Sequence, residues 1–163
     1  MPGLCKRTQT SRACVPGKLK SASMFILIVG AGRVGSAVAK RALDEGHTVS
    51  VLDLDPLSHE RLDKDQSTTW EDAGGRFTVG AALEIDALLE AGIDNADVFL
   101  AATSGDNTNL VIAQIAQRRF KVSRVVVRVA DPGRAAWYAE QGLQTISPTQ
   151  DAIDEATRAA LAA

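Results

Sequence analysis

A short apolar run that opens onto a glycine-rich turn most strongly constrains the fold of this chain. Met24 to Val29 form the run, and Gly30, Gly32 and Gly35 follow it in G-x-G-x-x-G spacing. The apolar pattern then changes to the 3.6-residue period of a helix. A strand, a glycine turn and a helix in this order predict a phosphate-binding βαβ unit.

The same alternation of short β-rich runs and longer helical patterns continues along the chain. We expect six strands, at Met24 to Val29, Thr48 to Asp53, Arg76 to Val79, Val98 to Ala102, Val125 to Val129 and Gln144 to Ile146. Helical patterns cover Val34 to Glu45, Leu57 to Asp65, Leu83 to Ala91, Asn107 to Arg119, Arg134 to Gln141 and Thr149 to Leu161.

The glycines and prolines between these predicted elements agree with this division. Gly46, Gly92 and Gly142 follow helical patterns, as C′ glycines often do. Pro56, Pro132 and Pro148 can each start a helix. Strands such as Phe25 to Val29 are apolar on both faces, so helices must cover both faces of the sheet. The prediction is an α/β fold, a Rossmann-like, doubly wound, mainly parallel six-stranded sheet.

In such a fold the ligand crevice lies at the carboxyl ends of the strands, where the strand order reverses. The least regular internal stretch, Gln66 to Gly75, is predicted to be a surface excursion in which Trp70 is a packing anchor.

Composition narrows the possible partners. The chain has 163 residues, a formal charge of -2 and 45% hydrophobic residues, so it fits one soluble globular domain that does not attract nucleic acid. No apolar run approaches the roughly 18 to 20 residues of a spanning helix, which predicts no direct membrane insertion.

Residues 1–23 are expected to be separate from the domain at 24–163. They mix basic residues with Ser, Thr, Gly and Pro without periodicity, which predicts a disordered leader, either upstream of a natural start at Met24 or a functional basic arm. Cys5 and Cys14 both lie there, and we interpret them as incidental thiols because neither has a histidine nearby.

The glycines predict the phosphate end of a site. Gly30 permits a tight turn, Gly32 lets the backbone approach a pyrophosphate, and Gly35 allows close packing of helix on sheet. The amides of the helix N-terminus would hold the anion. The alternative is a glycine turn that serves packing alone.

Asp53 predicts the ribose end of the same site. It lies at the end of the second strand, where a carboxylate accepts hydrogen bonds from adenosine ribose hydroxyls. Asp55 adds a second carboxylate and no arginine follows at once, which favours NAD(H) or a plain adenosine nucleotide over NADP(H). Asp55 can instead cap a helix that begins at Pro56.

Two further segments carry candidate ligand groups. Arg33 lies inside the glycine loop and can reach a phosphate, or can be a solvated charge at a helix start. Ala101 to Asn107 supplies hydroxyls and a helix cap at the rim of the crevice, and Thr103 and Asp106 can line the ligand there.

These segments together resemble a known family. Met24 to Gly35, Ala101 to Asn109, Val127 to Ala130 and the Gly142 to Pro148 ending are similar to the nucleotide-binding half of Trk/Ktr-type potassium-uptake regulators, the TrkA-N or RCK domains. The resemblance runs from Met24 to about Ala163.

The resemblance implies a cytoplasmic regulatory subunit that binds NAD(H) or ATP/ADP and gates a membrane potassium transporter or channel, at the inner face of the membrane, as a homodimer or ring. The candidate cofactor-binding residues are Gly30, Gly32, Arg33, Val34, Gly35, Asp53, Leu54, Asp55, Gly80, Ala81, Ala102, Thr103, Asp106 and Arg128.

The chain departs from the family pattern at two places. Family members often have Gly-Asp after the third strand, where this chain has Gly80-Ala81, and they commonly continue into a C-terminal subdomain that the printed sequence does not include.

The alternative function is an NAD-dependent oxidoreductase, because fold does not fix function. It would need a proton-transfer residue, and Tyr138 has no lysine four positions later, so the sequence favours binding without catalysis. The helix Thr149 to Leu161, with Ile153 on its apolar side, is expected to pack either on a neighbouring subunit or on its own sheet.

Overall fold

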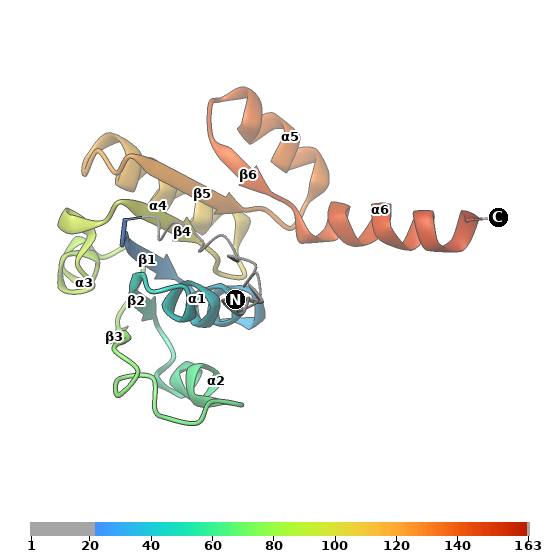
Figure 1. Ribbon diagram of the computed structural model, residues 1–163. Coiled ribbons are helices and arrows are strands. Elements are labelled where there is room, and N and C mark those ends of the chain that lie inside the picture. Colours follow the sequence, from blue (N-terminus) through green and yellow to red (C-terminus); the bar gives the residue numbers. More distant parts are fainter. Residues whose placement is uncertain (1–21, 163) are drawn as a thin grey trace, which may run out of the picture.

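Six parallel strands form one sheet in the computed structural model, which describes residues 22–162 (Figure 1). The strand order is β3-β2-β1-β4-β5-β6, so the order reverses between β1 and β4, as in the predicted doubly wound sheet. The strands are β1 (Phe25–Val29), β2 (Thr48–Asp53), β3 (Arg76–Val79), β4 (Val98–Ala101), β5 (Arg124–Arg128) and β6 (Gln144–Ile146).

The helices connect these strands in chain order. They are α1 (Arg33–Asp44), the 3₁₀ turn η1 (Pro56–His59), α2 (Glu60–Asp63), α3 (Ile85–Glu90), the 3₁₀ turn η2 (Ile93–Asn95), α4 (Asp106–Arg118), α5 (Pro132–Glu140) and α6 (Pro148–Leu161). The fold class predicted from the sequence is confirmed by this arrangement.

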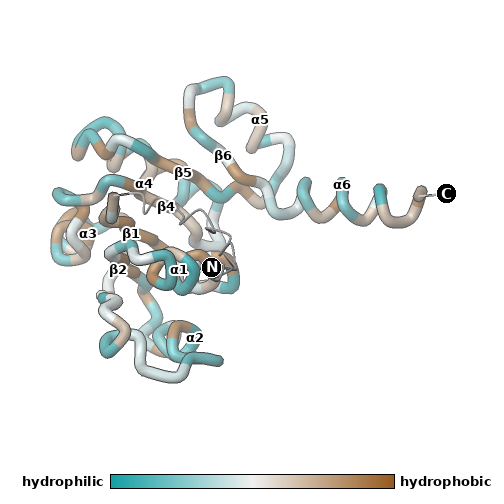
Figure 2. Tube along the Cα trace, viewed as in Figure 1, coloured by the Kyte–Doolittle hydropathy of each residue, from teal (hydrophilic) through white to brown (hydrophobic). Residues whose placement is uncertain are grey.

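Two layers of apolar side chains hold helices on the two faces of the sheet. Leu27 and Val29 of β1 belong to the layer that includes α3, α4 and α5. Ile26 and Ile28 alternate with them and belong to the layer beneath α1 and α2. Because side chains alternate along a strand, a continuous apolar run serves both layers, and Figure 2 shows this hydrophobic strip along the central strands.

Most predicted boundaries agree with the structure to within two residues, but the helix predicted at Leu57 to Asp65 is wrong. That stretch divides into η1 and the single turn α2, and Asp65 takes a left-handed φ of 61°. The Asp55 side chain accepts from the Leu57 amide and starts the 3₁₀ turn one residue before Leu57. The three C′ glycines adopt positive φ, and the three prolines begin their helices, as predicted.

Trp70 anchors the irregular segment between α2 and β3, as predicted. Its side chain is 2% exposed and lies in the layer beneath α1 and α2. A Cβ on Gly75 would come within 2.1 Å of the Trp70 ring, so the indole packs directly against the backbone of its own loop.

Helix α6 extends away from the sheet (Figure 1). It has no buried residue, so the expectation that it packs on its own sheet is wrong. Among the described residues, no helix is both long and apolar enough to cross a membrane. The prediction of a disordered leader falls mainly on residues 1–21, outside the described part of the chain.

Replacement of Gly35 by alanine tests the closest approach in the fold. A Cβ at Gly35 would lie 1.9 Å from the Gly30 carbonyl oxygen, so Gly35→Ala must displace α1 from the loop. We expect a loss of about 2–3 kcal/mol in the free energy of unfolding, measured by urea denaturation. In the control Gly32→Ala the Cβ meets nothing within 4 Å, and the expected loss is at most about 1 kcal/mol. Equal losses in the two variants would contradict this account of the packing.

Candidate nucleotide site

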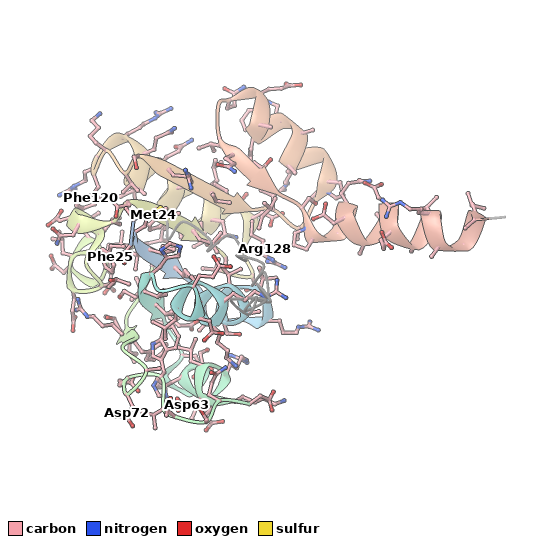
Figure 3. The ribbon with its side chains drawn as sticks, viewed as in Figure 1. Met24, Phe25, Asp63, Asp72, Phe120 and Arg128 are labelled. Carbon is pink, nitrogen blue, oxygen red and sulfur yellow. The ribbon has the colours of Figure 1, made fainter. Side chains whose placement is uncertain are left out.

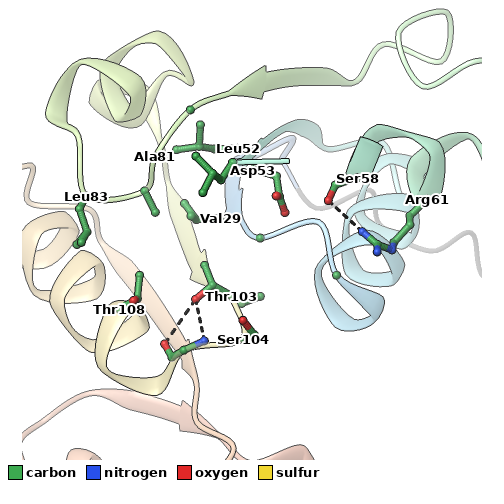
Figure 4. A pocket seen from close by; sticks show the side chains of 17 residues that line it. Val29, Leu52, Asp53, Ser58, Arg61, Ala81, Leu83, Thr103, Ser104 and Thr108 are labelled. Atoms are coloured by element: carbon green, nitrogen blue, oxygen red, sulfur yellow. Dashed lines mark hydrogen bonds between the residues drawn. The ribbon is translucent and has the colours of Figure 1, made fainter. Parts of the chain in front are cut away.

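A cleft of about 480 Å³ lies where the carboxyl ends of β1, β2, β3 and β4 meet (Figure 4). This volume is in the range of small-molecule sites. The residues that line the cleft are Val29, Gly30, Gly32, Leu52, Asp53, Leu54, Ser58, Arg61, Gly80, Ala81, Ala82, Leu83, Ala102, Thr103, Ser104, Gly105 and Thr108.

The glycine loop is pressed against the end of β4. Gly30 has a φ of +103°, and a Cβ there would lie 2.7 Å from the backbone of Ala102 and Thr103. Gly32 is different, because a Cβ would meet no protein atom within 4 Å and yet the residue lines the cleft. Close packing therefore requires glycine at positions 30 and 35, whereas Gly32 leaves open space at the cleft.

Two helices begin at this cleft without a side-chain cap. The N-cap residues of α1 and α4 are Gly32 and Gly105, neither helix has a side-chain capping bond, and both glycines line the cleft. By contrast, Asp131 and Ser147 cap α5 and α6 with side-chain oxygens. The first amides of an uncapped helix favour an anion, so the cleft offers two such ends to one ligand.

The Asp53 carboxylate joins β2 to the glycine loop. Its Oδ2 accepts from the Ala31 amide at 2.6 Å, and its Oδ1 accepts from the Asp55 amide at 2.9 Å. Each carboxylate oxygen can accept a further hydrogen bond, and Asp53 lines the cleft. Asp53 thus shapes the loop and still presents acceptors to a ligand.

The β4–α4 loop is fixed by a buried asparagine. The Asn109 side chain is fully buried and makes hydrogen bonds with every polar position it has. Its Oδ1 accepts from the Thr103 amide at 3.0 Å and the Thr103 hydroxyl at 2.6 Å, and its Nδ2 donates to the carbonyls of Thr103 and Arg128.

Arg128 and Asp106 join this loop to the end of β5. The Arg128 guanidinium donates from Nη1 to the Thr103 carbonyl at 2.8 Å. The Asp106 carboxylate accepts from the amides of Ala130 and Asp131 at 2.7 and 3.1 Å. Both side chains therefore hold the loop in place, and neither lines the cleft.

The structure brings together part of the predicted site. The predicted residues that line the cleft are Gly30, Gly32, Asp53, Leu54, Gly80, Ala81, Ala102 and Thr103. The others lie beside it. Arg33 is exposed at the first turn of α1, Val34 follows it, Gly35 is buried beneath the loop, and Asp55 caps η1.

Sequence reasoning missed Ser58 and Arg61 in the cleft wall. The Arg61 Nη1 donates to the Ser58 hydroxyl at 2.9 Å, and both residues line the cleft close to Asp53 (Figure 4). Their three-residue spacing places them on one side of a helical turn. That spacing, a few residues after Asp53 at the end of β2, is the signal that could have identified them.

A parallel doubly wound sheet with a glycine-loop cleft at its switch point defines a Rossmann-like domain of the nucleotide-binding type. The chain belongs to the TrkA-N domain family, whose model matches residues 26–148.

A named relative agrees with this family assignment. The chain is 41% identical over 135 residues to the Trk system potassium uptake protein TrkA of Streptomyces coelicolor, a match that covers 83% of the chain and 57% of that protein. The chain thus spans little more than half the length of this relative.

Solved structures show the same fold. The Kef C-terminal domain of Shewanella denitrificans in AMP-bound form has a TM-score of 0.68 at 24% identity, covering 84% of this chain and 79% of that one. The GsuK channel bound to NAD has a TM-score of 0.68 at 20% identity, covering 85% of this chain and 23% of that one.

Asn109 provides a test of how the loop is held. Asn109→Ala removes all four hydrogen bonds, and the part-buried Thr103 amide and Arg128 carbonyl lose their bonds to this side chain. The free energy of unfolding should therefore fall by about 2–4 kcal/mol. Asn107→Ala is a matched control on the same helix, because Asn107 is exposed and accepts a bond from Arg134. Its expected effect is within about 0.5 kcal/mol by urea denaturation. A small effect at Asn109 would show that the network does not hold the loop.

Proposed function

We propose that this chain binds NAD(H) or ATP/ADP in the β1–β4 cleft and acts as a regulatory nucleotide sensor of a membrane potassium transporter. The observation that carries the proposal is the pair of uncapped helix N-termini, with Gly32 and Gly105 as caps, at one cleft. Phosphate groups are the anions that such sites recognise in Rossmann-like folds.

The rest of the cleft suits the adenosine half of a nucleotide. Asp53 offers carboxylate acceptors for ribose hydroxyls at the end of β2. Leu54 and Leu83 are 71% and 55% exposed and line the same cleft, so they provide apolar surface for a base. Arg61 and Ser58 complete this side, and the guanidinium can stack on adenine or donate to the ribose.

Binding without catalysis fits the side chains in the cleft. Among the lining residues, Asp53 and Arg61 are the ionisable ones, and Asp53 already accepts two backbone hydrogen bonds. Tyr138 is 4% exposed in the core layer, and neither His47 nor His59 lines the cleft. These positions favour a sensor over the alternative, an oxidoreductase.

The name of a relative supports the proposed partner. The Streptomyces coelicolor relative is named as a Trk system potassium uptake protein, and this chain covers 57% of it. We propose the same system for this chain, with a cytoplasmic position at the inner membrane face held through a transporter subunit. A nucleotide can act as a signal only if it binds two states with different affinity.

Assembly into a homodimer or ring would give the sensor those two states. Helix α6 supports this part of the proposal, because its residues are unburied while Ile153, Ala156 and Ala160 repeat at helical spacing on one side. Ile153 itself is 49% exposed.

The binding proposal predicts stabilisation by nucleotides. Thermal-shift titration with NAD, NADH, ATP, ADP and AMP should raise the melting temperature, since a ligand at one hundred times its Kd adds about 2.7 kcal/mol. Gly32→Ala should weaken binding at least tenfold, because its Cβ enters space that the protein leaves open at the cleft.

A glycine outside the cleft gives the control for that titration. Gly133→Ala, in the first turn of α5, should leave nucleotide affinity unchanged. The site would be wrong if no nucleotide stabilises the chain, or if the two variants bind equally well. Turnover of NADH with carbonyl substrates would instead support the oxidoreductase.

The assembly proposal predicts an association that depends on α6. Sedimentation velocity should show dimers or larger species that dissociate on Ile153→Asp, because a charge on the apolar side of α6 disfavours burial. Asp154→Asn, on the polar side, is the control. A monomer at every concentration, with and without nucleotide, would remove this part of the proposal.

A further inference from the structure

A histidine held between two carboxylates lies outside the nucleotide cleft. The His59 Nε2 is 2.7 Å from a Glu71 carboxylate oxygen, and its Nδ1 is 3.3 Å from Asp63 Oδ2. Asp63 is four residues further along on α2, whereas Glu71 comes from the irregular segment before β3. Figure 3 places Asp63 at the lower edge of the molecule.

This arrangement is electrostatically incomplete with a neutral imidazole. Neutral histidine carries one N–H, so it can donate to one carboxylate while its other nitrogen presents a lone pair to the second. Among the described residues, Asp63 and Glu71 form ion pairs with His59 and with no lysine or arginine. The cluster therefore has a place for an added cation.

The two distances indicate which His59 nitrogen faces the place for the cation. The 2.7 Å contact is a normal hydrogen bond, so Nε2 carries the hydrogen and donates to Glu71. The 3.3 Å separation is long for a hydrogen bond, but it is close to the spacing of about 3.4 Å between nitrogen and oxygen ligands on tetrahedral zinc. The lone pair of Nδ1 thus faces Asp63 at the spacing of two metal ligands.

Both potential ligands are already held by further contacts. Glu71 fixes the tautomer of His59, and the His59 ring packs edge-on against Phe77 with centroids 5.1 Å apart. The second oxygen of Asp63 accepts from the Trp70 amide at 2.8 Å. Hydrogen bonds of this kind orient metal-ligating histidines and carboxylates. The side chains of His59 and Asp63 are 28% and 37% exposed, so water can fill the remaining positions.

We propose that His59 Nδ1 and Asp63 Oδ2 bind a divalent transition-metal ion of the Zn²⁺ class, with Glu71 as the acceptor that orients the imidazole. Imidazole nitrogen with carboxylate oxygen suits zinc better than Mg²⁺ or Ca²⁺, which prefer oxygen ligands. A bound ion would join η1, which carries His59, to α2, the helix that carries Arg61. Any effect on the nucleotide cleft through Arg61 rests on the proposed function, whereas zinc binding itself does not.

Zinc titration of the full chain tests the site without nucleotide. Cys5→Ser and Cys14→Ser form the parent, so that thiols do not compete for the metal. Isothermal titration with ZnCl₂ should show one site, with at least tenfold weaker affinity in His59→Ala and in Asp63→Asn. His47→Ala, which removes the other histidine of the chain, should bind as the parent does. MgCl₂ should give no comparable heat.

A second measurement identifies which His59 nitrogen binds zinc. It uses the parent protein itself, so the result does not depend on whether a variant folds. Long-range ¹H–¹⁵N spectra should show zinc moving the Nδ1 resonance of His59 and leaving its Nε2 protonated. The proposal is overturned if the parent binds no zinc, if His59→Ala binds as tightly, or if His47 responds instead.

Discussion

The contact between the glycine loop and its surroundings is the constraint on which the rest of the structure depends. Gly35 lets α1 approach the Gly30 carbonyl, and Gly30 lets the loop lie against the backbone after β4. These contacts place the start of α1 beside the start of α4, at the point where the strand order reverses. A side chain at either glycine would separate the two helix ends that form the candidate anion site.

The fold could be predicted from the sequence because its signals are local and repeated. The central strands are apolar runs, the longer helices have a 3.6-residue pattern, and Gly46, Gly92 and Gly142 mark helix ends with positive φ. The stretch after Asp55 was predicted less well. There the choice between one helix and two short turns depends on a side-chain cap and on the left-handed Asp65, which periodicity does not report.

The candidate site was partly predictable for a related reason. Residues next to strand ends, such as Asp53 and Thr103, reach the cleft because parallel strands end at the same edge. Arg128 and Asp106 also lie near that edge, but their hydrogen bonds are with backbone groups of neighbouring loops. Sequence position indicates which residues approach a crevice, whereas it does not indicate whether a side chain turns toward ligand or protein.

The hydrogen bonds of the Thr103 loop connect the cleft to more distant parts of the domain. Thr103 lines the cleft and is bonded to Asn109, which also holds the Arg128 carbonyl at the end of β5. Beyond β5 lie α5, β6 and α6, and α6 has no buried residue. A ligand that binds differently to two positions of the Thr103 loop would therefore bias the segment from which α6 extends. In the proposed regulator, this path joins the nucleotide to the surface that would meet a neighbour.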